Sequence, residues 1–190
     1  MGTLIQAGQD LVAGTGPGQL NQYYGFADTG SNTFTSATQG NLCTAYTIPA
    51  GEAYAGAAYE MSCAGFGTWG STQQTLAFQM LLGATLVGTA FGSLSTIPAT
   101  QLSASSAFNW SLVMRLTCAD GVSAWWGDIL GAVVSGGATM TSTIPVVAVN
   151  SGSHTAAVSS ALTAVIQAKW GSATGAPTLT TTKTTWRKVA

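Results

Sequence analysis

The chain has 190 residues, and only eleven of them carry a formal charge, six acidic and five basic. A typical soluble domain has about a quarter of its residues charged, and a net charge of −1 creates no long-range attraction for nucleic acid. The length suits a single domain, no apolar run is long enough to cross a membrane, and the first eleven residues lack the features of a secretory signal. The scarcity of charge favours a protein that is covered by neutral groups or by copies of itself.

The first forty residues are expected to form an extended arm. They are rich in Gly, Gln, Asn, Ser and Thr and contain few strongly apolar positions. One apolar cluster interrupts this pattern, and it consists of Leu20, Tyr23, Tyr24 and Phe26. These side chains would be a liability in water, so we expect them to dock the arm, residues 1–40, on a partner.

From residue 42 onward, short runs with a period of two alternate with Gly, Pro and Ser, a pattern that predicts β-strands. The runs cover residues 42–48, 57–63, 76–82, 108–118, 125–134, 140–149 and 178–189. Asp120 and Gly121 predict a hairpin between the fourth and fifth runs, and Pro145 makes residues 140–149 an edge strand or a bulge. Residues 156–170 fit both a helical period and alternation, and we favour a strand because the neighbouring segments are strand-like.

About eight short strands separated by turn signals predict an all-β fold. We expect an antiparallel β-sandwich of jelly-roll type over residues 41–190, with the extended N-terminal arm in front of it. Soluble monomers protect sheet edges and exposed faces with Lys and Glu, and this chain has few of either. Burial between copies would cover these surfaces, and we expect a homotrimer.

The chain has three cysteines, an odd number, and none of them has C-x-x-C spacing. They are Cys43, Cys63 and Cys118. In a chain without an export signal, we expect them to be reduced and to act as small hydrophobic residues of the core. A disulfide between two of them is the alternative.

The sequence offers little for catalysis or cofactor binding. The one histidine, His154, lies in a loop-like stretch with no nucleophile elbow in the chain, and we expect it to be solvated. Asp120 is explained by its turn, and Glu52 follows a Pro-Ala-Gly turn, which leaves Glu60 and Asp128 as candidates for a catalytic pair of carboxylates. We expect Glu60 instead to face solvent or to pair with Arg115. The sequence contains no recognisable metal-ligand set and no phosphate-binding glycine motif. We therefore expect a protein that is not an enzyme and that uses no cofactor.

Six tryptophans form the one constellation that could bind a ligand, and they are Trp69, Trp110, Trp125, Trp126, Trp170 and Trp186. Tryptophans contribute strongly to cores and subunit interfaces, which is the role we favour. Trp125 and Trp126 must point to opposite faces of their strand, so at least one is in the core. Exposed aromatic rings can also stack on sugars, and for that alternative Trp69, in a loop rich in Gly, Thr and Ser, is the best-placed contact.

Several segments follow one another in an arrangement that is similar to a known family. They are I-P-A-G-E (48–52), Y-E-M-S-C-A-G-F-G-T (59–68), L-A-F-Q-M-L-L-G-A-T-L (76–86), F-N-W-S-L-V-M-R-L-T-C-A-D-G (108–121) and A-K-W-G-S-A (168–173), before a Thr-rich closing strand. The arrangement resembles the jelly-roll minor virion proteins of tailed bacteriophages, which themselves resemble tumour-necrosis-factor-like sandwiches. The resemblance covers roughly residues 42–190 and consists of turns and aromatic positions.

The resemblance implies a capsid decoration, head-fibre or tail component, and it implies no active-site residues. We therefore expect a structural protein of a bacteriophage virion, assembled in the host cytoplasm, that trimerises and docks through its arm on the major capsid protein or another virion subunit. Neither nucleic acid nor a membrane is an expected partner. The alternative is a receptor- or glycan-binding module of a tail or head fibre.

Overall fold

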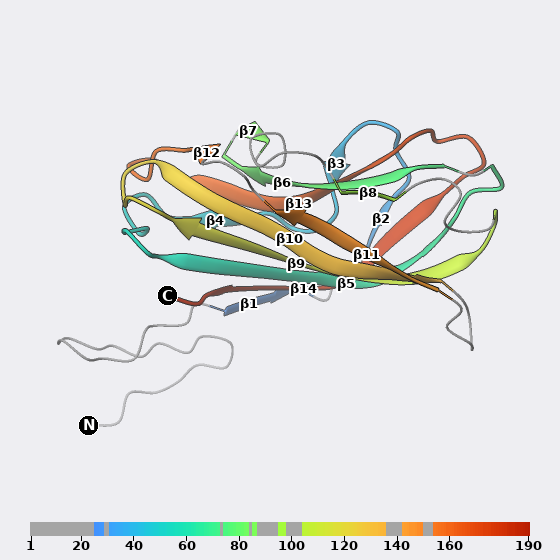
Figure 1. Ribbon diagram of the computed structural model, residues 1–190, viewed down its shortest axis with the longest axis horizontal. Coiled ribbons are helices and arrows are strands. Elements are labelled where there is room, and N and C mark those ends of the chain that lie inside the picture. Colours follow the sequence, from blue (N-terminus) through green and yellow to red (C-terminus); the bar gives the residue numbers. More distant parts are fainter. Residues whose placement is uncertain are drawn as a thin grey trace, which may run out of the picture.

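Two antiparallel β-sheets pack face to face in a β-sandwich (Figure 1). The computed structural model describes residues 25–28, 31–72, 74–83, 85–86, 95–97, 104–135, 142–149 and 154–190. Within these ranges every regular element is a β-strand. The prediction of an all-β sandwich is therefore confirmed, while the jelly-roll arrangement of its strands stays a prediction.

The larger sheet has eight strands, and six of them follow the order β1-β14-β5-β9-β10-β11. Their bounds are Gly25–Asp28 for β1, Thr178–Lys188 for β14, Ala58–Thr68 for β5, Ala107–Cys118 for β9, Ala124–Ser135 for β10 and Ser142–Val149 for β11. Two short strands complete the sheet: β2 (Asn32–Phe34) pairs with β14, and β12 (His154–Thr155) pairs with β10.

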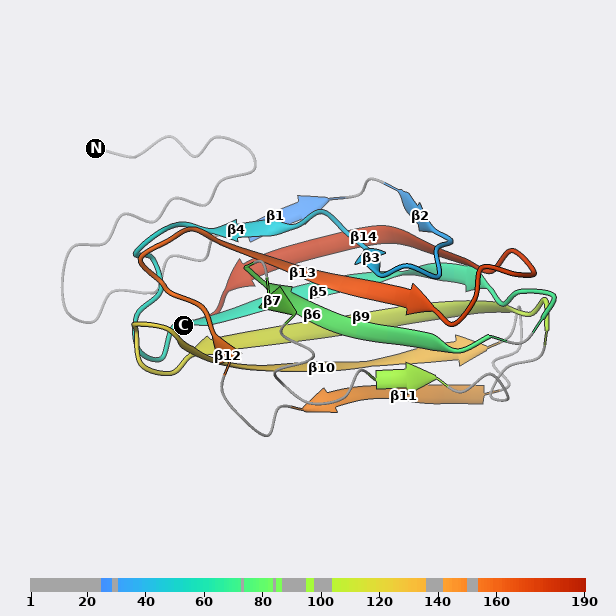
Figure 2. The ribbon, with the colours of Figure 1, turned by 90° about the horizontal axis from the view of Figure 1, so that it is seen from above.

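The smaller sheet lies over the larger one, as the view from above shows (Figure 2). Its main order is β3-β13-β6-β7, with bounds of Gly40–Asn41 for β3, Leu162–Trp170 for β13, Leu76–Leu82 for β6 and Thr85–Leu86 for β7. β4 (Tyr46–Ile48) pairs with β13, and β8 (Ser95–Ile97) pairs with β6. Residues 162–170 are thus a strand, as favoured from the sequence, and not a helix.

The hairpin predicted at Asp120 and Gly121 joins β9 to β10. Gly121 has a φ of 71°, a conformation that a residue without Cβ adopts most readily. The Asp120 carboxylate accepts three backbone hydrogen bonds of 2.8 to 2.9 Å, from the N–H groups of Val122, Ser123 and Ala124. These donors lower the pKa of Asp120. The carboxylate is thus a structural part of the turn, as expected.

The segment 42–48 departs from the prediction of one continuous strand. Its backbone breaks away between β3 and β4 because Leu42 bonds to both sheets: its N–H donates to the Ile166 carbonyl at 3.0 Å, and its carbonyl accepts a hydrogen bond from the Thr181 hydroxyl. β11 behaves as predicted from Pro145, since it lies at the edge of the larger sheet and pairs with β10.

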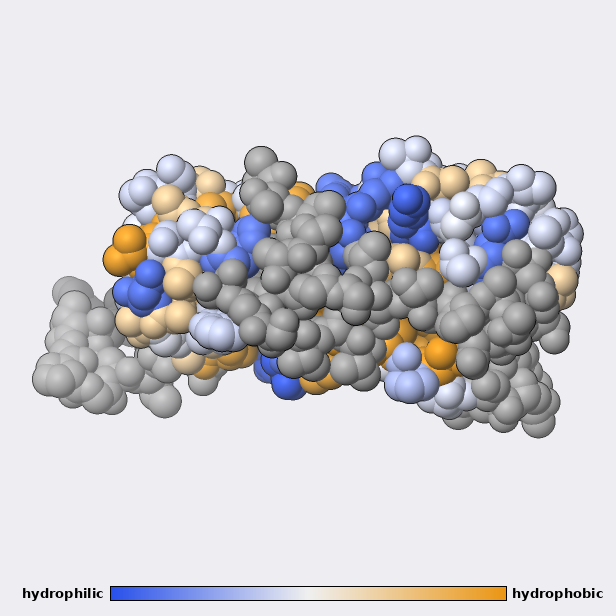
Figure 3. Space-filling model, turned by 45° about the horizontal axis from the view of Figure 1, so that its top comes forward, coloured by the Kyte–Doolittle hydropathy of each residue, from blue (hydrophilic) through white to orange (hydrophobic). Residues whose placement is uncertain are grey.

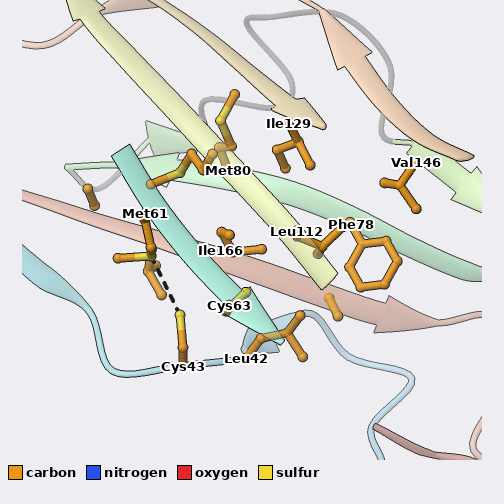
Figure 4. Packing of buried hydrophobic residues seen from close by; sticks show 14 of the residues in the cluster. Leu42, Cys43, Met61, Cys63, Phe78, Met80, Leu112, Ile129, Val146 and Ile166 are labelled. Atoms are coloured by element: carbon orange, nitrogen blue, oxygen red, sulfur yellow. Dashed lines mark hydrogen bonds between the residues drawn. The ribbon is translucent and has the colours of Figure 1, made fainter. Parts of the chain in front are cut away.

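The space between the sheets is filled by apolar side chains from both (Figure 4). All three cysteines are buried and free, as expected. The Cys43 thiol lies 3.6 Å from the Met61 sulfur, and a hydrogen bond with Cys43, together with burial, raises the pKa of the Cys63 thiol. Protonated thiols of this kind pack as small apolar groups.

Candidate interaction face

The larger sheet has one side turned away from the smaller sheet, and this outward side faces downward in Figure 1. Successive residues of a strand point to opposite sides of the sheet; in β9 the residues from Phe108 to Cys118 alternate between buried positions, which face the core, and exposed or half-exposed ones. We call the outward positions of β14, β5, β9 and β10 the outer face. Its neutral members on β5, β9 and β10 are Ala58, Ser62, Ala64, Phe66, Thr68, Ala107, Asn109, Ser111, Val113, Thr117, Ala124, Trp126, Leu130, Ala132 and Val134.

Four charged residues stand in one line across this face. The strand registers pair Arg187 with Glu60, Glu60 with Arg115, and Arg115 with Asp128. We call these four residues the charge row. It contains four of the eleven charged residues of the chain, its signs alternate from β14 to β10, and its net charge is zero.

Glu60 is the centre of the ion pairs in the row. Its carboxylate accepts a hydrogen bond of 3.0 Å from Arg187 Nε and one of 3.4 Å from Arg115 Nε. The predicted pairing of Glu60 with Arg115 is thus confirmed, and Arg187 adds a second partner. Both arginine side chains are more than half exposed, so each pair contributes about 0–1 kcal/mol to the stability of the fold.

Asp128 is partly buried at the end of the row. Burial raises the pKa of its carboxyl group, nearby Arg115 lowers it, and Glu60 raises it further. Among the described residues, the Oδ1 atom of Asp128 has no hydrogen-bond partner. The structure places Glu60 and Asp128 on the same face, but Arg115 stands between them, and two arginines engage the Glu60 carboxylate.

A second charged cluster fastens the end of β14 to the segment before β5. Lys188 Nζ lies 3.8 Å from a Glu52 carboxylate oxygen and 4.8 Å from the centroid of the Tyr54 ring. The Tyr59 hydroxyl donates to the same Glu52 oxygen at 3.2 Å, and burial, followed by the charge of Glu52, raises the pKa of Tyr59 above its ordinary range. Both ion-paired side chains are mostly buried, which suits a structural clasp.

On the outward side of the smaller sheet, side-chain amides hydrogen-bond to one another across the strands, where the larger sheet has ion pairs. The Gln167 side chain on β13 accepts a hydrogen bond of 3.1 Å from Gln79 on β6 and donates one of 2.7 Å to Asn41 on β3. In Figure 3, which turns this side toward the reader, much of the coloured surface is pale, with small strongly hydrophilic and strongly hydrophobic areas. The two outward surfaces of the sandwich therefore differ in chemistry, and the charge row belongs to the larger sheet.

A small pocket of about 140 Å³ lies where β2 and β14 meet the segment after β3. Its lining consists of Ser31, Asn32, Leu42, Cys43, Thr44, Thr181 and Thr184. Two of its polar groups are already used within the protein, since the Thr181 hydroxyl and the Asn32 amide both donate to backbone carbonyls. The pocket has no charged side chain in its wall and is a weak candidate for ligand binding.

Trp69, named from the sequence as the sugar contact of the glycan-binding alternative, is not exposed. Its ring is fully buried and meets the Trp170 ring edge-on, with centroids 5.2 Å apart. Trp69 follows β5 directly, so its backbone continues the strand's alternation, and the ring enters the core. Trp125 and Trp126 do point to opposite sides, as expected: Trp125 is fully buried and Trp126 is 44% exposed. Of the six tryptophans, Trp126 is the exposed one, and it lies on the outer face.

The expectation of a solvated His154 is also wrong. The residue lies in β12, opposite Trp125 of β10, and its side chain is buried. Burial lowers the pKa of His154, and a hydrogen bond with the Leu82 backbone opposes this shift. A buried, neutral histidine in the core explains the residue without a catalytic role.

The predicted arm is described only in part. Leu20, Tyr23 and Tyr24 lie outside the described residues, and Phe26 lies in β1, where its backbone is opposite Trp186 of β14. β2 also pairs with β14, and Phe34 at its end is buried in the core. The described parts of residues 1–40 thus include strands of the larger sheet, and docking by the four aromatic and apolar residues stays a prediction.

Comparison of the chain with models of protein families, with curated proteins and with solved structures found no match. Within the described ranges, no helix is long and apolar enough to cross a membrane. The same ranges hold no group of three His, Cys, Asp or Glu side chains that could bind a metal ion.

Proposed function

We propose that the protein is a structural subunit that assembles with copies of itself through the outer face. The observation that carries this proposal is the composition of that face. Apart from Lys183, neutral residues surround a charge row of zero net charge, and the large side chains of Phe66 and Trp126 are 52% and 44% exposed. Exposed aromatic side chains are enriched where proteins meet other proteins. The remaining surface offers few charges that would keep copies apart.

We propose further that the assembly belongs to a bacteriophage particle, as a capsid decoration or minor capsid protein. The resemblance of residues 42–190 to phage minor virion proteins supports this proposal, and the sandwich fold is compatible with it. In this proposal the segment 1–40 docks on the major capsid protein or another virion subunit. Residues 25–28 and 32–34 of that segment form β1 and β2, which pair with β14 in the larger sheet.

The role we propose is structural and not catalytic. The strongest candidate for catalysis was the carboxylate pair of Glu60 and Asp128. Glu60 is held between Arg187 and Arg115, and the two carboxylates stand on either side of Arg115. This arrangement is typical of a structural ladder across a sheet.

Purified protein should be larger than one chain in solution. One chain has a mass of 19.2 kDa, and light scattering after size exclusion should give a multiple of this mass at about 10 μM, the range in which specific interfaces are populated. A monomer that persists at tenfold higher concentration would contradict the proposal. If that monomer bound to a glycan array through Trp126, the receptor-binding alternative would replace it.

Antibodies against the purified protein should label intact particles of the virus whose genome encodes the chain. Electron microscopy of gold-labelled particles would locate the protein on the shell or on a fibre. Pre-immune serum and particles of an unrelated virus serve as controls. Absence of label from both intact and disrupted particles would contradict a place in the virion while leaving self-assembly untouched.

A further inference from the structure

The charge row is complementary to itself when its direction is reversed. From β14 to β10 its signs are plus, minus, plus, minus, in the order Arg187, Glu60, Arg115 and Asp128. In the opposite direction the order is minus, plus, minus, plus. Two outer faces whose rows run in opposite directions would therefore place Arg187 against Asp128 and Glu60 against Arg115, and each of these contacts would occur twice.

One symmetry operation produces this arrangement. A two-fold axis that runs parallel to the strands, between β5 and β9, turns one outer face toward the other, reverses the order of the strands and preserves position along them. β5 and β9 are the central pair of the order β1-β14-β5-β9-β10-β11, so the same axis lays β14 over β10 and β1 over β11. A two-fold axis along the charge row would instead place each charge against its own copy, which is repulsive.

We propose that two copies of the chain stack face to face about the axis between β5 and β9 and form an isologous dimer. This inference rests on the proposed function, and it specifies both the partner surface, which is the chain's own outer face, and the symmetry. An isologous contact closes at two copies. The dimer, or an even-numbered assembly of dimers, therefore takes the place of the homotrimer expected from the sequence.

The orphaned carboxylate oxygen of Asp128 gains a partner in this arrangement. Its Oδ1 atom is buried and lacks a hydrogen bond among the described residues, at a cost that buried polar groups rarely carry without a reason. The side chain of Arg187 is 58% exposed. Its Nε and one terminal nitrogen bond to Glu60, which leaves the remaining N–H groups of the guanidinium to reach across. An Arg187 from the second copy, placed opposite Asp128, would supply the missing donor.

The area of the outer face and the residues that would meet across the axis suit such a contact. The four strands of the face lie about 4.8 Å apart and have about eleven residues each. With a rise of about 3.3 Å per residue, they give a face of roughly 19 by 36 Å, or about 700 Å², which is of the order of the roughly 800 Å² that each partner buries in a stable complex. The axis would place Phe66 over Asn109 and Ala64 over Ser111. Lys183 would lie over neutral Ala132, without a like charge opposite.

Reversal of one charge at a time tests the arrangement. Arg187→Glu alone and Asp128→Arg alone each place like charges against one another twice, and we expect the dissociation constant of the homodimer to rise at least tenfold in each variant. An equal mixture of the two variants restores opposite charges at both contacts. Sedimentation velocity of the full-length chains, one of them fluorescently labelled, should therefore show a mixed dimer at concentrations where each variant alone is monomeric.

Lys169→Glu is the matched control, because it makes the same charge change on β13 at an exposed position of the smaller sheet; it should assemble like the unaltered chain. Far-ultraviolet circular dichroism and melting temperature verify that each variant is folded. Two results would contradict the two-fold stacking while leaving the proposed function in place, provided that the unaltered chain assembles. In the first, both single variants assemble as well as the unaltered chain. In the second, both variants are monomeric and fail to combine when they are mixed. If the unaltered chain is monomeric, the proposed function itself fails.

Discussion

Replacement of Trp170 by alanine should lower the free energy of unfolding by about 4 kcal/mol. Trp170 is a fully buried residue of β13 in the smaller sheet, and its ring lies edge-on to Trp69 and Phe108 at centroid distances of 5.2 and 6.5 Å. Both of these rings come from the larger sheet or its immediate continuation, so the cluster joins the two layers. The change removes both the buried apolar area and the contacts that the ring makes. Chemical denaturation followed by tryptophan fluorescence would measure the loss.

Trp126→Ala is the control for this experiment, because it removes the same side chain from an exposed position. In solution dilute enough to be monomeric, it should change the free energy of unfolding by less than about 1 kcal/mol. Trp170→Phe should recover much of the lost stability, since it keeps an aromatic ring in the cavity. Equal effects of Trp170→Ala and Trp126→Ala would contradict the buried position of Trp170.

Replacement of Gly65 by alanine should also destabilise the sandwich, by about 3 kcal/mol. A Cβ atom at Gly65 would lie 1.8 Å from the Thr180 carbonyl oxygen, which is a backbone atom that cannot turn aside. The close approach occurs beside the irregular pairing of β5 with β14 between Thr181 and Lys183. Thermal unfolding of the variant should show a lower midpoint, because the pairing of β5 with β14 must open to admit a methyl group.

Gly51→Ala separates this steric effect from the general cost of replacing glycine. Gly51 has a φ of 74° and no atom within 4 Å of the position of an added Cβ, so its substitution costs only the backbone strain, about 1 kcal/mol. A loss at Gly65 no greater than that at Gly51 would mean that β14 can shift away from β5 without harm.

Local patterns were sufficient to predict most of the strands. β9 alternates strictly over its length, and a turn whose Asp and Gly have specific roles joins it to β10, so the hairpin was correctly predicted. The segment 42–48 was not, because the break at Leu42 depends on hydrogen bonds to Ile166 and Thr181, more than a hundred residues away. No local pattern contains that information.

The candidate site was only partly predictable for the same reason. Glu60 was expected either to face solvent or to pair with Arg115, and it does pair with Arg115. Arg187 was missed because the bulge in β14 interrupts the alternation that would place its side chain. The buried position of Trp69 was also missed, although the sequence of β5 contains a pattern that indicates it. The inward positions of β5, from Tyr59 through Met61 and Cys63, predict an inward side chain at residue 69 if the alternation continues past the end of the strand.

The edges of the larger sheet limit how copies can join. β11 closes one edge and contains Pro145, which has no backbone N–H to donate, and β1 at the other edge has only four residues. Short or proline-containing edge strands resist the addition of further strands, which is the step that lengthens a sheet into a fibril. A chain with so little charge would otherwise be at risk of fibrous aggregation. Association through the outer faces, with sheet edges that resist added strands, favours discrete particles over fibrils.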